Sequence, residues 1–521
     1  MKTIVFKNIR LPYTAHMGEA VDIALKRAKG AGIKISDPYI YKRSVDSRRK
    51  DDILFVYSVA AVCERVSEKQ LKKTDASLEK EGWVTPAEGK EALSARPVVC
   101  GFGPAGMFAA LLLSEQGYRP IVLERGSDVK ARAEKVETFM KTGVLDTSCN
   151  IQFGAGGAGT FSDGKLVTRI SDPACRYVFE RLVEFGAPKE IMYDAKPHIG
   201  TDKLLGIVDA ISERVKALGG EIYYDTTLRA INKTNGHISS VTTDKGEIEC
   251  GALILAIGNS ARDTYRYLMG ENYVVEPKPF SVGVRIEHLR EDIDKAMYGD
   301  HAGDPILGAA PYAFSKRVGE DAVYTFCMCP GGEVIAAASE ENAVVTNGMS
   351  RYARDGVNSN AAVVVSVRSD DPIAYQEALE KRGFMAGGGG YYAPCQSVGD
   401  FLDGKAHKLP NRIRPTYMGG KVRKYDLNDL FESRICDMLK LGITAFNGSL
   451  HGFAARDAVL TGPETRTSAP VRITRNEGYL ALGTDNLYPS GEGAGYAGGI
   501  TSAAVDGLRC ACALISRYKR V

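Results

Sequence analysis

The six residues from position 101 to 106, Gly-Phe-Gly-Pro-Ala-Gly, have the types and spacing of a loop that binds a diphosphate. The apolar run Pro97–Cys100 precedes them and the apolar segment Met107–Glu115 follows, which predicts a strand, a glycine turn and a buried helix. Gly101 permits the tight turn, Gly103 lets the backbone approach the ligand, and Gly106 lets helix and strand pack closely. The helix N-terminus, beginning near Pro104 and Ala105, offers unpaired N–H groups to the phosphates.

An acidic residue follows the next predicted strand, Tyr118–Leu123. Glu124 lies about 20 residues beyond the glycines, where such loops place a carboxylate that accepts hydrogen bonds from ribose hydroxyls. Because a carboxylate repels a 2′-phosphate, the motif predicts an adenine dinucleotide and disfavours NADP at this site. Arg125, the next residue, belongs to the same predicted site. The alternative, a glycine turn that only packs, is disfavoured by the complete strand, turn, helix, strand and acid order.

A second glycine-rich stretch lies within residues 150–166 and carries five glycines in eleven residues. With so few side chains, its backbone must approach another chain segment or a planar ligand closely. A flavin is the economical candidate, and a tight connection between domains is the alternative. The residues predicted to contact the cofactor here are Gly156, Gly157, Gly159, Thr160 and Lys165.

A third glycine block, Gly491–Ile500, precedes a predicted helix over Thr501–Tyr518. A helix dipole aimed at a flavin ring would stabilise the negative charge that develops on reduction, and Glu492 would accept hydrogen bonds from ribityl hydroxyls. The alternative is an ordinary glycine-rich helix entry. The residues assigned to the cofactor here are Gly491, Glu492, Gly498, Gly499 and Ile500.

An antiparallel meander is predicted between these blocks, and it returns into a buried strand that ends at Gly258. The glycine falls where a parallel strand presents its carboxyl edge, which is the ligand-binding edge of open α/β sheets. Gly258 is therefore assigned to the same site. The predicted strands are Glu221–Tyr224, Leu228–Asn232, His237–Thr242 and Glu247–Ile257.

Composition limits the class of protein. At 521 residues with 44% hydrophobic and 25% charged residues, the chain is typical of a globular protein with two or three domains. A net charge of +3 gives no bulk attraction to nucleic acid or membranes, and the basic run near Lys42 and Arg49 is interpreted as a solvated hairpin. The eleven cysteines fit reduced thiols, with no zinc-like spacing. Because no zinc-like spacing is present, we expect no metal. No apolar run has the length of a signal peptide or a spanning helix, so we expect a cytoplasmic protein.

The fold class predicted from this order is α/β, with three parts. Residues 1–92 form a small β-α-β-β domain, ferredoxin-like in part and used for docking rather than nucleic acid. Residues 93–271 and 475–521 together form a discontinuous Rossmann-like domain. Residues 272–474, which show alternating strands without a second strand, glycine turn and helix unit, form an inserted α+β substrate or cap domain.

Few side chains stand out for chemistry. Cys327 and Cys329 flank Met328 on a predicted strand, so both thiols should share one face, either as a redox pair or as small buried hydrophobes, and we favour the second. Lys165 and Arg466 are candidates for pairing with a reduced flavin or an acidic substrate, although surface ion pairs explain them equally well. Three histidines are candidate proton donors but are more often structural. These histidines are His198, His288 and His451. No catalytic residue is assigned.

Together these segments resemble FAD flavoproteins of the two-dinucleotide-binding type. The match is carried by PVVCGFGPAGMFAALLLSEQG with VLERG, by LILAIGNSA and by YPSGEGAGYAGGITSAAVDG. More closely, NIQFGAGGAGTFSDGKL, GVRIEH, TFCMCPGG and GPETRTSAPVRI resemble a largely uncharacterised bacterial family of FAD-dependent dehydrogenases with a small N-terminal domain. The resemblance implies that Leu228 contacts the adenine through its backbone. It also implies a ribityl contact for Glu492, where related flavoproteins usually have Asp.

The function expected on this basis is an FAD-dependent oxidoreductase that transfers hydride or electrons between bound FAD and a small-molecule substrate. NADH or NADPH would bind transiently as electron donor, without a Rossmann domain of its own. No membrane partner is expected, and nucleic acid is disfavoured. The alternative is an FAD-containing RNA-modifying or RNA-binding protein that uses its N-terminal module.

Overall fold

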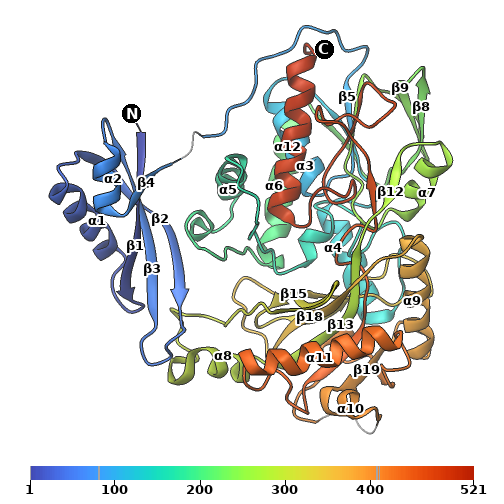
Figure 1. The fold of residues 1–521 in the computed structure, drawn as a ribbon. Helices are drawn as coiled ribbons and strands as arrows, with labels where there is room; N and C mark the ends of the chain where they lie inside the picture. The colour runs from blue at the N-terminus through green and yellow to red at the C-terminus, as the bar shows by residue number, and fades with distance from the viewer. Residues whose placement is uncertain (1, 80–81, 407–408, 410) are drawn as a thin grey trace.

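The computed structural model describes residues 2–79, 82–406, 409 and 411–521. Its N-terminal domain stands to one side of a larger body (Figure 1). The domain has a four-stranded antiparallel sheet in the order β2-β3-β1-β4, with helices α1 and α2. This is a complete ferredoxin-like β-α-β-β-α-β arrangement. The bounds are β1 Lys2–Pro12, α1 Gly18–Gly30, β2 Ile35–Asp46, β3 Leu54–Cys63, α2 Glu68–Thr74 and β4 Ala76–Leu78.

The predicted β-α-β-β unit is present, but it was incomplete, because helix α2 and strand β4 follow it. The missing helix and strand lie in a polar stretch that we interpreted as a connection. Helix α2 has only seven residues and no apolar stripe, so periodicity could not reveal it. Its signal is local: Ser67 caps the helix by accepting from the Gln70 backbone N–H, while the Gln70 side chain accepts from the Ser67 N–H, a capping box.

A five-stranded parallel sheet in the order β23-β11-β5-β6-β7 lies at the centre of the second domain. The side chains of successive residues in its short strands pack into two different hydrophobic clusters, one on each face of the sheet. Val99 and Ile254 pack with α3, α5, α6 and α12 on one face, whereas Val98 and Leu253 pack beneath the β8–β10 meander on the other. Covering both faces is the rule for parallel sheets. The bounds are β5 Pro97–Cys100, α3 Pro104–Glu115, β6 Ile121–Leu123, α4 Val129–Thr142, η1 Ala158–Phe161, α5 Ala174–Glu184, η2 Lys189–Met192, α6 Thr201–Ala217, β7 Glu221–Tyr223, β8 Leu228–Thr234, β9 His237–Thr243, β10 Gly246–Glu249, β11 Ala252–Leu255, α7 Arg262–Gly270, β23 Leu487–Pro489 and α12 Ile500–Arg517.

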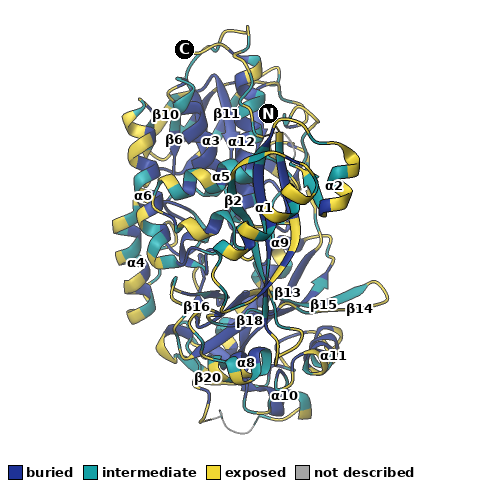
Figure 2. Ribbon diagram, turned by 90° about the vertical axis from the view of Figure 1, so that its left-hand side faces the viewer, coloured by how far each residue is buried: buried dark blue, intermediate teal, exposed yellow. Residues whose placement is uncertain are grey.

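This is a Rossmann-type domain assembled from two separated parts of the chain. Strand β23 pairs in parallel with β11, and helix α12 packs against α3, although both follow the insertion in sequence. Figure 2 shows α3 and β11 in the dark blue of buried residues, whereas α4 and α1 carry exposed stripes. The almost uniformly apolar segment before Glu115 is thus a central helix, buried on all sides.

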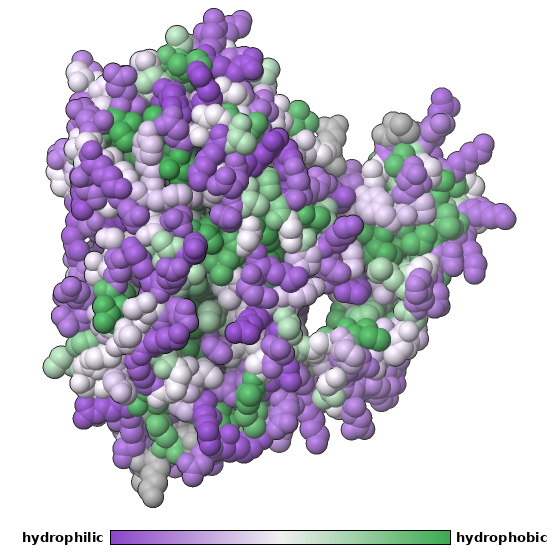
Figure 3. Space-filling view, turned by 180° about the vertical axis from the view of Figure 1, so that it is seen from behind, coloured by the Kyte–Doolittle hydropathy of each residue, from purple (hydrophilic) through white to green (hydrophobic). Residues whose placement is uncertain are grey.

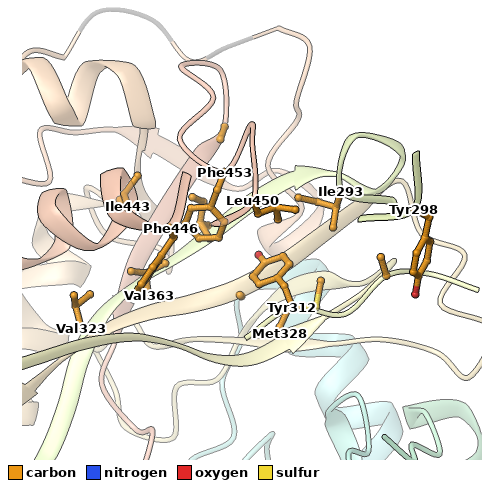
Figure 4. Packing of buried hydrophobic residues seen from close by; sticks show 14 of the residues in the cluster. Ile293, Tyr298, Tyr312, Val323, Met328, Val363, Ile443, Phe446, Leu450 and Phe453 are labelled. Atoms are coloured by element: carbon orange, nitrogen blue, oxygen red, sulfur yellow. The ribbon is translucent and has the colours of Figure 1, made fainter. Parts of the chain in front are cut away.

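The inserted domain is built on a seven-stranded mixed sheet in the order β14-β15-β18-β13-β21-β19-β20. Helix α11 packs against β15 and β18, and aromatic rings fill the space between them (Figure 4). The Phe453 ring meets the Tyr312 ring edge-on at 5.5 Å and the Phe446 ring edge-on at 5.6 Å between centroids. The bounds are β12 Val275–Pro277, β13 Phe280–Leu289, α8 Arg290–Tyr298, η3 Gly299–His301, β14 Ser315–Val318, β15 Asp321–Cys329, β16 Glu333–Ala336, β17 Thr346–Met349, β18 Asn358–Val367, α9 Pro372–Ala386, β19 Ala393–Ser397, α10 Val398–Asp403, η4 Tyr417–Gly419, β20 Val422–Lys424, α11 Ser433–Ser449, β21 Val459–Glu464 and β22 Val471–Ile473.

The N-terminal domain contacts the body at separated points. Arg43 on β2 forms an ion pair with Asp194 at 2.8 Å, and the Tyr13 hydroxyl donates to Asp304 at 2.9 Å. The space-filling view shows an opening between this domain and the larger body (Figure 3). Within the described part of the chain, no helix combines the length and apolarity needed to cross a membrane.

Candidate functional site

The three glycine segments meet at one cavity of about 360 Å³, between the carboxyl edge of the parallel sheet and the inserted domain. This volume is within the range of small-molecule and cofactor sites. The backbone forms much of the wall because the segments carry few side chains. The residues predicted from sequence that line the cavity are Gly101, Gly103, Pro104, Ala105, Glu124, Arg125, Gly157, Gly159, Lys165, Leu228, Gly258, Glu492, Gly498, Gly499 and Ile500.

Four other residues predicted to contact the cofactor lie behind this wall. A Cβ on Gly106 would come within 1.9 Å of the Gly101 carbonyl oxygen, so this glycine allows α3 to pack against the loop. Gly156 has a φ of +83°, and a Cβ at this position would collide with the Thr160 hydroxyl, which faces the protein interior. The Gly491 N–H donates to Asp506 at 2.7 Å. These positions shape the loops without bordering the cavity.

The Glu124 carboxylate connects the loops at the end of the cavity where the adenosine of the cofactor is predicted to bind. One oxygen accepts from the Phe102 N–H at 2.8 Å, and the other accepts from the Gly126 and Gly154 N–H groups at 2.9 Å each. Glu124 is only 5% exposed, yet it borders the cavity. Its negative charge is therefore fixed in place before any ligand arrives, and a 2′-phosphate would meet it unfavourably.

Arg132, which was not predicted from the sequence, holds the second glycine segment by hydrogen bonds to its backbone. Its side chain on α4 is fully buried and donates to the carbonyl oxygens of residues 150, 151, 154 and 155 at 2.6–3.2 Å. Burial lowers the pKa of this guanidinium to about 10. The helix reads as polar throughout, so no sequence signal separates this arginine from its solvated neighbours.

Asp506 has the corresponding role for the third segment. From α12 it accepts from the Gly491 N–H and forms an ion pair with Arg475 at 2.6 Å. Neighbouring Glu492 receives a hydrogen bond from the Asn259 amide at 3.1 Å and borders the cavity. Burial raises the pKa of the Glu492 carboxyl to about 7, although the Asn259 hydrogen bond and the Lys278 charge oppose the rise.

The inserted domain forms the remaining wall. Strand β15 has a bulge between Phe326 and Cys329, where three steps along it match two steps along β18. Cys327 within the bulge has a φ of +41°, an uncommon conformation for a residue other than glycine. The bulge brings Phe326 to the cavity beside both thiols, whereas Met328 enters the core. Simple strand alternation, which predicted one face for the thiols, could not reveal the bulge.

Two buried charge networks hold the inserted domain at the cavity. Arg285 pairs with Glu464 at 2.7 Å, and both side chains are almost fully buried. Arg466 and Arg262 each donate to both oxygens of the Glu380 carboxylate, with shortest distances of 2.8 and 2.7 Å. Arg466, a candidate partner for flavin or substrate, therefore has its charge matched within the protein. Other lining residues that sequence analysis did not single out are Gln152, Phe153, Ser162, Asp163, Asn259, Ser260, Asn347, Gly348, Glu464, Thr467 and Ser490.

The three candidate histidines lie outside the lining of this cavity. His198 makes a 3.0 Å hydrogen bond with the Tyr352 carbonyl oxygen and stacks on the Tyr352 ring. His288 is buried, with a 2.8 Å contact to the Phe453 carbonyl oxygen, and His451 is exposed. These contacts give the first two histidines structural roles.

Comparison with known proteins matches the inserted domain, over residues 279–467, to the family described as "FAD-dependent protein, C-terminal domain-like". An "Uncharacterized protein" of Clostridium beijerinckii is 45% identical over 492 residues, which are 92% of each chain. Among solved structures, glycine oxidase of Bacillus cereus is 11% identical over 82% of this chain and 98% of its own, with a TM-score of 0.32. CtdE in complex with FAD and a substrate is 10% identical over 80% and 79%, with a TM-score of 0.35.

The fold and the glycine-lined cavity thus define a Rossmann-type dinucleotide-binding protein, and its cofactor is FAD. The cavity fits that cofactor, because a Cβ on Gly103 would point into space with its nearest neighbour, Gly157 Cα, at 3.7 Å. The chain belongs to the family of FAD-dependent proteins that it shares with the clostridial relative.

Filling the space at Gly103 should block the cofactor without unfolding the protein. In Gly103→Val the new side chain would occupy the place where the diphosphate approaches the loop, while the φ of −78° suits valine. We expect FAD affinity to fall at least about tenfold, with the apoprotein melting temperature nearly unchanged. Gly270→Ala, at a site with no atom within 4 Å of the new Cβ, is the control. Undiminished FAD binding in G103V would contradict the assignment.

Removing the Arg132 side chain should destabilise the whole domain. Arg132→Met leaves four buried carbonyl groups without their donor, so we expect a loss of about 3 kcal/mol in the free energy of unfolding. Arg229→Met, which alters a side chain 56% exposed, should change stability little. Urea denaturation of the two variants measures the difference, and equal midpoints would show that Arg132 does not support the loop.

FAD affinity should depend on pH through Glu492. The apoprotein carboxyl, with its pKa near 7, is largely protonated at pH 6, and hydroxyl donors of FAD favour the ionised form. Affinity should therefore increase as pH rises toward 7, by no more than about tenfold per pH unit, because one proton is involved. Fluorescence titration between pH 5.5 and 8 measures this. Glu492→Gln should flatten the profile, and an unchanged profile would rule out Glu492 as the titrating group.

Proposed function

We propose that this protein is an FAD-dependent oxidoreductase that transfers hydride or electrons between bound FAD and a small-molecule substrate. One observation carries the proposal: the cavity extends beyond the glycine loops to a wall of side chains from β15, β17 and the end of β21. A dinucleotide held by the loops does not require this second wall. A second reactant placed against it would be adjacent to the cofactor.

The protein's own residues have binding and orienting roles in this proposal. The loops at Gly101–Gly106, Glu124 and the α12 N-terminus hold the cofactor, and FAD itself supplies the hydride or electron chemistry when bound. Phe326 and Thr467 line the opposite wall and exclude water from a bound substrate. The buried Arg285–Glu464 pair fixes that wall in position.

NADH or NADPH is the proposed electron donor, binding transiently. Residues 272–474 carry no second strand, glycine turn and helix unit, so the donor would have no Rossmann domain of its own. The RNA-modifying alternative has no support from the comparisons. The basic turn of the N-terminal domain is also partly neutralised, because Arg48 pairs with Asp46 at 2.6 Å.

Anaerobic reduction tests the proposed function. The purified holoprotein should be yellow, and NADH or NADPH should bleach its visible flavin absorbance, whereas admitted oxygen or another acceptor should restore it. The G103V variant, mixed with free FAD and the same nucleotide, is the matched control, because flavin bleached in that mixture is reduced by contaminants rather than in the site. A holoprotein whose flavin neither nucleotide reduces would contradict this donor assignment, and a protein that cannot be reconstituted with FAD would contradict the function.

A further inference from the structure

The two arginines on the cavity wall have their charge balanced by close acidic partners, and Glu464 pairs with Arg285 at 2.7 Å. Arg125 pairs with Asp263 at 2.8 Å. Arg466 shares Glu380, at 2.8 Å, with Arg262, and Glu340 balances the second cation at 2.8 Å from Arg262. Such pairs contribute little net charge to the cavity. Lys165 is the exception among these lining residues.

Lys165 shares its one acidic neighbour with a stronger partner. Its Nζ lies 3.8 Å from Asp163, outside hydrogen-bond distance. Arg354 binds the same carboxylate with two hydrogen bonds of 2.9 and 2.6 Å, and the Ser350 hydroxyl donates to it as well. Two cations and one carboxylate leave this cluster with a charge of +1 beside the cavity.

The Lys165 ammonium also lacks any hydrogen-bond partner in the described structure. The nitrogen is closed off from solvent, while the side chain as a whole is 29% exposed and borders the cavity. A buried ammonium without an acceptor is costly. Its flexible four-carbon stem lets it turn toward an acceptor that enters the cavity.

The neighbouring cavity residues do not supply the missing negative charge. Burial raises the pKa of the Cys327 thiol to about 11 and also raises that of Cys329, although the Lys165 charge opposes both shifts. Both thiols therefore stay neutral at pH 7. Phe326 and Val167, which also line the cavity, are apolar.

We infer that the substrate admitted to this cavity is a carboxylic acid or similar anion with an apolar body, and that Lys165 binds its acidic group. The apolar body would lie against Phe326 and Val167. This inference rests on the proposed function and specifies the substrate class of the same site. Lys165 is a binding residue in this account and takes no part in bond making.

Titration of the holoprotein with paired probes tests the inference. Benzoate, phenylacetate and hexanoate are compared with benzamide, phenylacetamide and hexanamide, and perturbation of the visible flavin spectrum is the readout. At least one carboxylate should perturb the spectrum and saturate, while its amide should bind at least about tenfold more weakly. Equal effects of acid and amide, or no effect of any carboxylate on a yellow protein, would overturn the inference.

Variants then locate the binding group. Measured on protein fully loaded with FAD, Lys165→Met should weaken the effective carboxylate at least about tenfold, and Lys165→Arg should retain more of the affinity. Lys203→Met, at a lysine above the Tyr352 ring outside the cavity lining, is the matched control. A K165M variant with unchanged carboxylate affinity but a shifted flavin midpoint potential would overturn the inference, because Lys165 would then act on the flavin.

The outcomes separate this inference from the proposed function. Carboxylate binding that depends on Lys165, in a holoprotein that no nucleotide reduces, would support the substrate class and contradict the donor. Bleaching by NADH, in a protein whose flavin spectrum no carboxylate perturbs, would support the donor and contradict the substrate class. A protein that binds no FAD would overturn both.

Discussion

One carboxylate organises the cofactor end of this molecule. Glu124 accepts backbone N–H groups from the first glycine loop, from the turn after its own strand and from the second glycine segment. Its hydrogen bonds join three segments that form no common sheet at that point. Because buried N–H groups require acceptors, the loops adopt this geometry together or lose three hydrogen bonds together. Backbone hydrogen bonds to one carboxylate thereby help to give the glycine-rich segments a defined shape.

The same principle recurs around the cavity. Arg132 binds the carbonyl oxygens of the second glycine segment, and Asp506 binds the backbone of the third. Each glycine segment is bound by a charged side chain: Glu124 follows strand β6, Arg132 lies on helix α4 and Asp506 on helix α12. The backbone can then face the cavity while a charged hydrogen bond fixes its position from the far side. The cofactor wall is consequently mostly backbone, whereas the opposite wall from the inserted domain is mostly side chain.

The sequence was most informative where local chemistry repeats a known pattern. The glycine turn at 101–106, the acid at Glu124 and the α12 glycine block were recognisable because spacing alone specifies them, and they converge on one cavity in the structure. Arg132 was missed because a charged residue that will be buried looks like a solvated one on a polar helix, and Asp506 was missed because no spacing rule marks a single acid on α12 as a partner of loop backbone. The bulge at Cys327 and the short helix α2 escaped for another reason: each departs from the periodicity on which strand and helix predictions depend.

The discontinuity of the Rossmann domain has a consequence for how the chain becomes a protein. Strand β23 and helix α12 follow the entire inserted domain, yet they complete the sheet edge and the third glycine segment. During synthesis the insertion therefore emerges before the cofactor site has all its parts, and domains generally fold as they emerge. The insertion must reach its fold with its cavity wall, including the bulged strand β15, facing an unfinished neighbour. The nucleotide site can be completed only after residues 487–517 have been synthesised, when the inserted domain that forms its opposite wall has already emerged.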